Sequence, residues 1–377
     1  MNIFDYLNWR CDVPFSAAAF NDVDNLILSE LIYTDFGGIV PENGMQISLA
    51  DACAAFFQMH DRNEIAARTS YTARAPFLME YMLQGSRFCD LRLSHYRAIT
   101  DKDQTTQFAS IIFHLADGTA YVAFRGTDGT VVGWKEDFLL SYCSGTAGQK
   151  DAVSFLDYAA EVTAGPLRVG GHSKGGNFAV YAAVFCKPDT FSRIERVYSN
   201  DGPGFRADVT SLEMYRSVMS RTISIVPDTS VIGLLLANDC TRIVVRSAAS
   251  GIAQHDGFSW ETERERFVPA ELSRTSEIIQ RTISRWVDGL DAETLESLVD
   301  SVFTLIEATG EDTFHSMSMQ KAKTAEAMLQ AMRGLSWEKR KELLSVLAQL
   351  LQSGGTAVTE SFTGKNLPQH SENELSS

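Results

Sequence analysis

The sequence feature that most constrains the fold is a Gly-x-Ser-x-Gly pentapeptide centred on Ser173. It lies between a short apolar run at Leu167–Gly171, which predicts a strand, and a helical pattern at Lys174–Phe185. A serine on so sharp a turn adopts a strained backbone, and side chains two residues before and after it would collide. Because Gly171 and Gly175 fill those two positions, the pattern predicts that Ser173 projects as a nucleophile from the carboxyl edge of a sheet.

The segments on both sides of this turn alternate between short apolar runs and helical patterns. Such alternation predicts an α/β fold with a mostly parallel sheet and helices on both faces. Between the apolar runs at 107–114 and 119–125, Ala116-Asp117-Gly118 predicts a hairpin turn. Strands are expected at residues 91–99, 107–114, 119–125, 167–171, 194–199, 222–226 and 241–246, and helices at 153–162 and 174–185.

The segments outside this core, which spans residues 91–265, are predicted to be helical. Residues 1–90 are mainly helical in pattern and are expected to pack on the core. Residues 266–353 are expected to form an antiparallel helical appendage, with Ser336 as the N-cap of its last helix. Residues 354–377 are polar and aperiodic, which predicts a flexible tail. The helical patterns lie at 23–33, 48–59 and 73–84, and in the appendage at 276–287, 295–306, 321–332 and 343–351.

The charge balance excludes one class of partner. Asp and Glu number 48 against 33 Lys and Arg, a formal net charge of −15, so the excess of basic side chains that nucleic-acid binding needs is missing.

No apolar run reaches the roughly 18 residues of a transmembrane segment, and Asp5 stands where a signal peptide would carry Lys or Arg. We therefore expect a cytoplasmic protein whose six cysteines, none in a Cys-x-x-Cys pair, are free thiols. The oligomeric state is left open.

A nucleophilic serine needs a base, and the chain has seven histidines from which to choose. In strand–turn–helix serine enzymes of this type, the base follows the nucleophile and the acid along the chain. His255 satisfies that order, in a turn-rich loop after the strand expected at 241–246. The other six precede Ser173, adjoin it with the side chain directed elsewhere, or fall in the appendage or the tail: His60, His95, His114, His172, His315 and His370.

Two aspartates are candidates for the acid that orients the base. Asp201 ends the strand expected at 194–199, and Asp228 ends the strand expected at 222–226. Both strand ends lie at the same edge of the sheet, so either carboxylate can approach the imidazole, although either can instead close an Asx turn. We favour Asp228 and keep Asp201 as the alternative.

Acyl transfer also needs hydrogen-bond donors for the oxyanion. One is the N–H of Lys174, directly after the nucleophile, and a second usually comes from the loop after an early strand. Thr127, which follows Ala123-Phe124-Arg125-Gly126, lies in such a loop and offers both an N–H and a hydroxyl. The simpler interpretation is a buried salt bridge for Arg125 and a turn hydroxyl for Thr127.

These motifs resemble those of a known family. Ala123–Thr127 and Gly133–Phe138 are similar to the Phe-Arg-Gly-Ser/Thr and Trp-x-x-Asp motifs of class 3 triacylglycerol lipases. Gly171–Gly176 is similar to their Gly-His-Ser-Leu-Gly-Gly motif, with Lys174 in place of the leucine. The resemblance covers about residues 90–260.

The resemblance to class 3 lipases implies an α/β-hydrolase-type fold. It also implies that Ser173, Asp228 and His255 form the triad, that Thr127 lies at the oxyanion hole, and that Trp134–Phe138 falls where those lipases carry a lid. Over most of its length the chain more closely resembles a bacterial lipase-like family of unknown function. That similarity runs through Asp5–Arg10, Phe20–Leu26, Asp201–Phe205 and Gln254–Asp256.

The sequence therefore predicts a serine hydrolase, an esterase or lipase-like enzyme that cleaves carboxylic esters through an acyl-enzyme. Its substrate would be a small-molecule or lipid ester, and this chemistry requires no metal or organic cofactor. Two alternatives stay open. The same triad can act as an acyltransferase or thioesterase, and a catalytically inactive hydrolase fold can serve as a binding module.

Overall fold

The computed structural model describes residues 1–68, 70–288, 290, 292–313, 317, 320–337 and 339–341. The helix expected at 343–351, the tail at 354–377, His315 and His370 lie outside these residues. Within them, no helix is both long and apolar enough to span a lipid bilayer.

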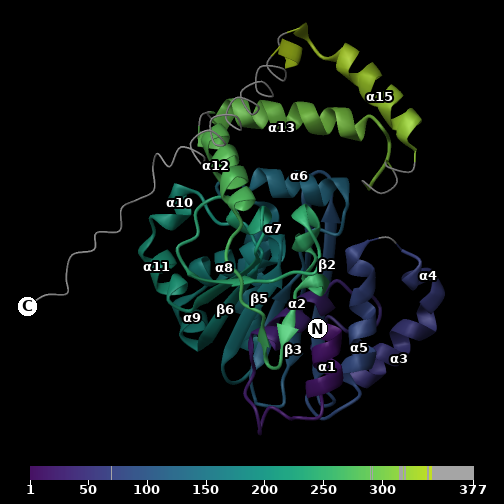
Figure 1. Ribbon diagram of the computed structural model, residues 1–377, viewed down its shortest axis with the longest axis vertical. Helices are drawn as coiled ribbons and strands as arrows, with labels where there is room; N and C mark the ends of the chain where they lie inside the picture. The colour runs from purple at the N-terminus through teal and green to yellow at the C-terminus, as the bar shows by residue number, and fades with distance from the viewer. Residues whose placement is uncertain are drawn as a thin grey trace, which may run out of the picture.

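An eight-stranded sheet forms the centre of the molecule, and its strands lie side by side in their order along the chain (Figure 1). β1 to β4 pair antiparallel and β4 to β8 pair parallel, which confirms the α/β fold class with a mostly parallel sheet. All seven expected strands are present within two residues of their predicted ends. The strands are β1 (Ile47–Ser48), β2 (Arg92–Asp101), β3 (Thr106–His114), β4 (Ala120–Phe124), β5 (Leu167–His172), β6 (Ile194–Asn200), β7 (Thr222–Pro227) and β8 (Thr241–Val245).

This strand order places the connecting helices on one face of the sheet. When parallel strands follow one another in chain order, crossovers of a single hand all return over the same face. Helices α7 (Ala147–Val162) and α8 (Lys174–Phe185) pack there against Val122 and Phe124 of β4, and α11 (Glu213–Met219) packs against α8 and β7. The opposite face of β4, with Tyr121 and Ala123, is left for other elements to cover.

The N-terminal helices cover that opposite face. Helices α1 (Ile3–Arg10), α2 (Asp22–Leu31) and α3 (Leu49–Met59) form a second apolar core with it, and in Figure 1 α1 and α3 are seen at the lower right. The prediction that residues 1–90 pack on the core is consistent with this arrangement. Without them, one face of the sheet would expose its apolar side chains to water.

One predicted helix is wrong in type. The segment expected as a helix at 73–84 is a 3₁₀ helix, η1 (Tyr71–Phe77), followed by a short α-helix, α5 (Leu78–Met82). Pro76 lies inside η1, and because proline has no N–H and a fixed φ it interrupts an α-helical hydrogen-bond pattern. The remaining short elements of this part and of the core are α4 (Arg62–Ala66), α6 (Val131–Leu139), α9 (Pro188–Arg193), α10 (Ala207–Thr210), η2 (Ile232–Leu234), η3 (Gly251–His255), η4 (Gly257–Ser259), β9 (Thr262–Glu263) and β10 (Arg266–Phe267).

Helix α2 buries polar side chains as well as apolar ones. Asp24 pairs with Arg87, both side chains being fully buried, and accepts a hydrogen bond from the Tyr6 hydroxyl at 2.9 Å. Asn25 donates to the side chain of Asn200, at the end of β6, at 2.8 Å. Each buried polar atom needs a partner in a particular place, so these contacts fix the position of α2 on the sheet.

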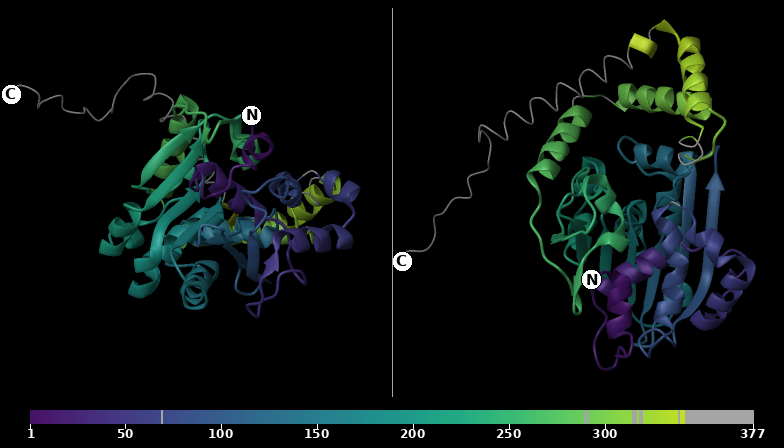
Figure 2. Two further views of the ribbon diagram at one scale, coloured as in Figure 1. Left: turned by 90° about the horizontal axis from the view of Figure 1, so that it is seen from below. Right: turned by 45° about the vertical axis from the view of Figure 1, so that its right-hand side comes forward.

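The appendage packs on the core through α6. Its described helices are α12 (Arg274–Asp288), α13 (Ala292–Glu307) and α15 (Lys321–Gly334), at the positions expected from the amphipathic patterns. α13 lies over α6, where the rings of Phe138 and Phe303 approach with centroids 5.7 Å apart (Figure 2). The N–H of Val131 also donates to the Asp312 carbonyl at 2.9 Å, which extends this interface beyond the helix.

Candidate active site

Ser173 lies on the turn between β5 and α8. Its backbone has φ 58° and ψ −131°, a strained conformation that residues other than glycine rarely adopt. Its N–H donates to the Asn200 carbonyl at 2.8 Å, which ties the turn to the end of β6. A Cβ at Gly171 or Gly175 would collide with the Phe124 carbonyl, so glycine is what allows β4 and α8 to approach this closely.

His255, at the end of η3, is hydrogen-bonded to Asp201. The distance from His255 Nδ1 to Asp201 Oδ2 is 2.6 Å. The second carboxylate oxygen accepts from the Ser230 hydroxyl at 2.5 Å and from the Gly233 N–H at 3.1 Å, and the Asp201 side chain is fully buried. A carboxylate on Nδ1 holds the proton there, so Nε2 is left as the acceptor that a general base requires.

The structure does not bear out the preference for Asp228 as the partner of His255. The Asp228 carboxylate accepts from the Thr229 hydroxyl at 3.1 Å, and its backbone carbonyl accepts from the Ser273 N–H at 2.8 Å. Asp201 has the advantage because β6 pairs directly with β5, which carries Ser173, whereas β7 is one strand further away. Its own backbone is in the left-handed range, with φ 49°, which turns the chain sharply at the end of β6.

The structure brings His255 next to the turn that carries Ser173 without closing the last hydrogen bond. The His255 ring lies against the ring of His172, the residue before Ser173, with centroids 4.6 Å apart. Among the described residues, no side chain forms a hydrogen bond with Ser173 Oγ, and that of His255 is no exception. Catalytic hydrogen bonds in unliganded enzymes are often long and shorten when substrate binds.

His172 supports the loop that carries His255. Its Nε2 lies 2.7 Å from the His255 carbonyl, which can only accept, so Nε2 carries the proton. Its Nδ1 is then free to accept from the Tyr33 hydroxyl at 3.1 Å. Burial holds the pKa of His172 well below its usual value, and burial raises the pKa of Glu30, 3.7 Å away, well above its usual value. Burial therefore disfavours the charged form of both groups.

Thr127 is held by the helix that follows it. Its hydroxyl donates to Asp137 Oδ2, on α6, at 2.7 Å. Burial raises the pKa of the Asp137 carboxyl to about 6, and the Lys174 cation opposes that rise. The neighbouring Arg125 pairs with Asp128 at 3.4 Å, so the salt bridge considered for Arg125 is present.

The side chain of Lys174 points into the protein. Its ammonium lies 2.8 Å from Glu136 Oε2 and 3.1 Å from Gln107 Oε1, and both members of the Lys174–Glu136 pair are fully buried. The backbone N–H of Lys174 remains at the start of α8, directly after Ser173. The lysine that replaces the leucine of the class 3 motif therefore contributes no exposed charge beside Ser173.

Three residues that support the site, and the positioning contact of His172, do not follow from the sequence pattern; the three are Tyr33, Glu136 and Asp137. Signals existed for two of them. Lys174 begins a helix that is otherwise apolar, and a lysine there demands a buried acid. Glu136 and Asp137 are consecutive acids within the mainly apolar stretch Val131–Leu139.

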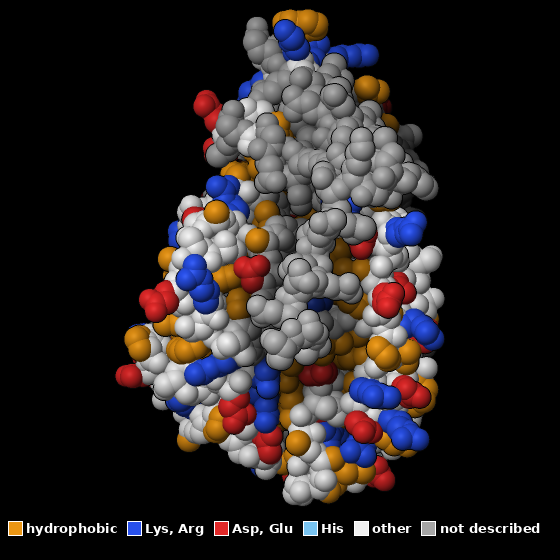
Figure 3. All heavy atoms as spheres, turned by 60° about the vertical axis from the view of Figure 1, so that its left-hand side comes forward, with side chains coloured by type: hydrophobic (Ala, Val, Ile, Leu, Met, Phe, Trp, Pro, Cys, Tyr) orange, Lys and Arg blue, Asp and Glu red, His pale blue; other side chains and the backbone are white. Residues whose placement is uncertain are grey.

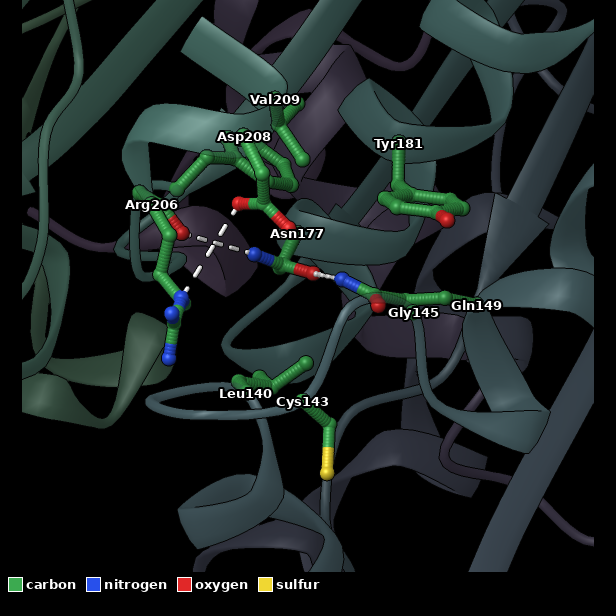
Figure 4. Close-up of a pocket in the computed structure, with 11 residues that line it drawn as sticks. Leu140, Cys143, Gly145, Gln149, Asn177, Tyr181, Arg206, Asp208 and Val209 are labelled. Carbon is green, nitrogen blue, oxygen red and sulfur yellow. Dashed lines mark hydrogen bonds and ion pairs between the residues drawn. The ribbon is translucent and has the colours of Figure 1, made fainter. Parts of the chain in front are cut away.

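Two cavities among the described residues have no candidate site residue in their lining. One of about 10 Å³ lies beside α8, where the Asn177 side chain accepts from Gln149 at 2.8 Å (Figure 4). It has room for about one water molecule. A groove of about 400 Å³ is lined by residues of α1 and of the η1–α5 segment, such as Phe4 and Tyr81, none of them a site residue. On the face shown in Figure 3, acidic and basic side chains are interspersed and form no continuous basic patch.

A family model and several solved structures match the chain. The model of the Mbeg1-like family matches residues 82–304, more than half of the chain. The chain belongs to the Mbeg1-like family. The Mbeg1-like region runs from α5 into α13 and therefore includes Ser173, Asp201 and His255. No curated protein matches the chain significantly.

Three of the solved structures that resemble this Mbeg1-like chain are lipases. A Rhizomucor miehei lipase–propeptide complex is 16% identical, with a TM-score of 0.32, over 42% of this chain and 57% of that one. M37 lipase is 14% identical, with a TM-score of 0.36, over 57% of this chain and 70% of that one. A fungal lipase–inhibitor complex is 15% identical, with a TM-score of 0.34, over 55% and 70%. The chain spans little more than half of the length of the first of these relatives.

Proposed function

We propose that the protein is a serine hydrolase that cleaves carboxylic esters, with Ser173 as nucleophile, His255 as base and Asp201 as acid. The observation that carries the proposal is the 2.6 Å hydrogen bond from His255 to the buried Asp201, beside a strained serine on a strand–helix turn. If the hydrogen bond between His255 and Asp201 were only structural, nothing would require the strained backbone that Ser173 adopts at the end of the neighbouring strand. The similarity of the motifs around Thr127 and Ser173 to those of class 3 lipases supports the same reaction class.

The proposed reaction follows from the roles of these groups. His255 Nε2 takes the proton of Ser173 Oγ as the oxygen attacks the ester carbonyl carbon. The negative charge on the former carbonyl oxygen is stabilised by the N–H groups of Lys174 and Thr127. His255 then gives its proton to the leaving alkoxide, and water repeats the sequence on the acyl-enzyme. Asp201 keeps the imidazole in the productive tautomer throughout.

Exposed apolar side chains near the site favour an ester with an apolar acyl group. Ile252, three residues before His255, is 68% exposed, and Phe138 on α6 is 43% exposed. An apolar acyl chain that covers such side chains removes their surface and its own from water, which is favourable. We therefore propose a lipid or other apolar carboxylic ester as the substrate class.

The first test is covalent labelling of the serine. A fluorophosphonate probe is expected to label the wild-type protein, and Ser173→Ala is expected to abolish labelling because it removes the only oxygen that the probe would modify. Hydrolysis of p-nitrophenyl esters should be lost in the same variant. A wild-type protein that stays unlabelled in buffer and in detergent would contradict the proposal and favour an inactive binding module.

The second test separates the two candidate acids. Asp201→Asn is expected to reduce kcat for p-nitrophenyl esters by about 10²-fold or more, because an amide cannot hold the imidazole in the same tautomer. Asp228→Asn is the matched control and is expected to stay within about threefold of wild type. Loss confined to Asp228→Asn would overturn the assignment of Asp201.

The third test addresses the acyl acceptor. Wild-type protein is incubated with a p-nitrophenyl ester and increasing concentrations of an alcohol or a thiol, and the products are separated. Free carboxylic acid as the main product supports hydrolysis. A new ester or thioester that dominates at low acceptor concentration would favour an acyltransferase on the same triad.

A further inference from the structure

Lys174 and Glu136 form a buried ion pair behind the proposed oxyanion hole. Lys174 supplies its backbone N–H to that site, while its side chain turns away to meet Glu136 at 2.8 Å. A cation at the first position of a helix is unfavourable because it faces the positive end of the helix dipole. The class 3 motif has leucine here, so the fold as such does not require a lysine. The pair therefore calls for an explanation beyond packing.

Glu136 is held rigidly by the elements around it. Its carboxylate accepts hydrogen bonds from the Gln107 N–H at 2.9 Å, the Gly148 N–H at 3.1 Å and the hydroxyls of Thr106 and Thr146 at 3.2 and 3.1 Å. These donors come from β3 and from the start of α7. A Cβ at Gly148 would collide with the carboxylate, which shows how closely that backbone approaches it. Glu136 is thus a fixed point to which the start of α8 is tied.

The next residue of α6 performs the same task for the other donor. Asp137 accepts from the Thr127 hydroxyl at 2.7 Å, while Glu136 binds the Lys174 ammonium. Consecutive acids on one helix therefore contact the side chains of both residues whose N–H groups are proposed to receive the oxyanion. The two donors belong to different elements, the loop after β4 and the first turn of α8, and α6 connects them.

We propose that Lys174 and Glu136 are positioning residues that set the separation of the two oxyanion donors. The inference rests on the proposed serine hydrolase. Donors aimed at an oxyanion act on the transition state and hardly at all on the bound ester, so a shift in their separation lowers kcat and leaves KM nearly unchanged. If the pair served only to stabilise the fold, breaking it would not lower kcat while leaving KM nearly unchanged.

The test compares Lys174→Met, Glu136→Gln and the double variant with wild type. Each single variant is expected to lose about tenfold or more in kcat for p-nitrophenyl esters, with KM within about threefold, and to react more slowly with the fluorophosphonate. The double variant is expected to lose no more than the worse single variant, because both changes break one contact. If Lys174→Met does not fold, Glu136→Gln, which keeps the shape of the side chain, gives the same readout.

Two controls separate positioning from loss of stability. Val184→Ala truncates a buried residue further along α8 without touching the pair, and it is expected to lower the melting temperature while leaving kcat within about threefold. Lys187→Met removes the cation of an exposed pair with Glu161 and should change neither quantity.

Four results would overturn the inference, and the first three leave the proposed function intact. Wild-type kcat in both single variants, with wild-type protein labelled and active, would show that the pair does not position the donors and would leave the proposed function intact. Loss in Lys174→Met alone would point to the charge itself. A fall in kcat in Val184→Ala equal to that in Lys174→Met would reduce the effect to stability. A wild-type protein without labelling or esterase activity would instead remove the proposed function and this inference with it.

Discussion

Helices α2 and α13 both cover the α/β core, and they are attached to it by different kinds of contact. α2 is attached through buried polar groups, Asp24 with Arg87 and Asn25 with Asn200. α13 is attached to α6 through the apolar side chain of Phe303 and through an ion pair of Glu307 with Lys135. The side chains of that ion pair are 53% and 22% exposed.

The difference teaches which helix belongs to the site. A buried polar contact specifies one position, because any other position leaves an unpaired group in the interior. An apolar contact or an exposed ion pair stabilises a helix without fixing its register so strictly. Tyr33, two residues beyond the end of α2, reaches His172, so the position of α2 bears directly on the loop of His255. The contacts of α13 described above end at α6.

The largest expected effect is at the buried pair of α2. Arg87→Ala is expected to lower the free energy of unfolding by about 3–5 kcal/mol, because it leaves the Asp24 carboxylate uncompensated in the interior. Urea unfolding followed by circular dichroism measures the change. Lys187→Ala, at an exposed pair, is the control and should leave the free energy of unfolding nearly unchanged. Equal losses in the two variants would break the distinction between buried and exposed attachment.

Truncation in α13 is expected to have a large but local effect. Phe303 is buried, and Phe303→Ala should weaken the α13–α6 interface by about 3–5 kcal/mol. Hydrogen exchange followed by mass spectrometry should show faster exchange in α13 and α6, while β5 and α8 keep their protection. If β5 and α8 lose protection to the same extent, the appendage is as integral to the core as α2.

The polar contact between α2 and β6 is expected to matter less than the ion pair. Asn25→Ala removes a partner of Asn200 and of the Tyr121 hydroxyl, both buried, and should cost about 1–3 kcal/mol. The backbone carbonyl of Asn200 also accepts a hydrogen bond from the Ser173 N–H. Because a shift of Asn200 would therefore move Ser173, kcat for p-nitrophenyl esters should fall as well. Unfolding and turnover are measured on the same preparation. Lost stability with unaltered turnover would confine α2 to a structural role.

The pH dependence of stability tests the burial of Asp137 on α6, the helix to which α13 is attached. Burial raises the pKa of Asp137 from 3.8 to about 6. Between those values the folded protein binds a proton more readily than the unfolded chain, so this group makes the free energy of unfolding fall as the pH rises. Asp137→Asn should remove that slope, and Asp189→Asn, at an exposed position on α9, should retain it. Parallel profiles from urea unfolding at several pH values in this window would contradict the expectation.

The smallest effect is expected at the exposed ion pair of α13. Glu307→Gln should lower the free energy of unfolding by about 0–1 kcal/mol, and salt should reduce even that, since the charges are partly solvated. Urea unfolding at low and high salt measures both. A loss above about 2 kcal/mol that persists in high salt would show that this pair is as firmly buried as the one in α2.

Sequence alone predicted the parts of the site that depend on local pattern. The strand and helix around Ser173, and the roles of Gly171 and Gly175, follow from residues that are neighbours in the chain. The place of His255 after the last core strands also follows from chain order. These features need no knowledge of how distant segments pack.

The choice between Asp201 and Asp228 could not be made in the same way. Both residues end strands, and the difference lies in which strand pairs with β5, a property of the sheet that the chain does not reveal locally. Glu136 was missed for the same reason, since its partner Lys174 is 38 residues away. The 3₁₀ helix at η1 differs from the expected α-helix because the apolar spacing fits an α-helix, whereas Pro76 lacks the N–H that one requires.

The order of the strands has a consequence for how the chain reaches its native state. Because successive strands are neighbours, the parallel half of the sheet can grow by short-range steps, each new strand adding to the last. The helices on the opposite face have no such help: Asn25 meets Asn200 across 175 positions, and the Asn2 carbonyl meets Thr262 across 260. Contacts with so wide a separation are slow to form, so α1 and α2 should settle only after the sheet exists, and a nascent chain would carry their apolar surfaces unprotected until then.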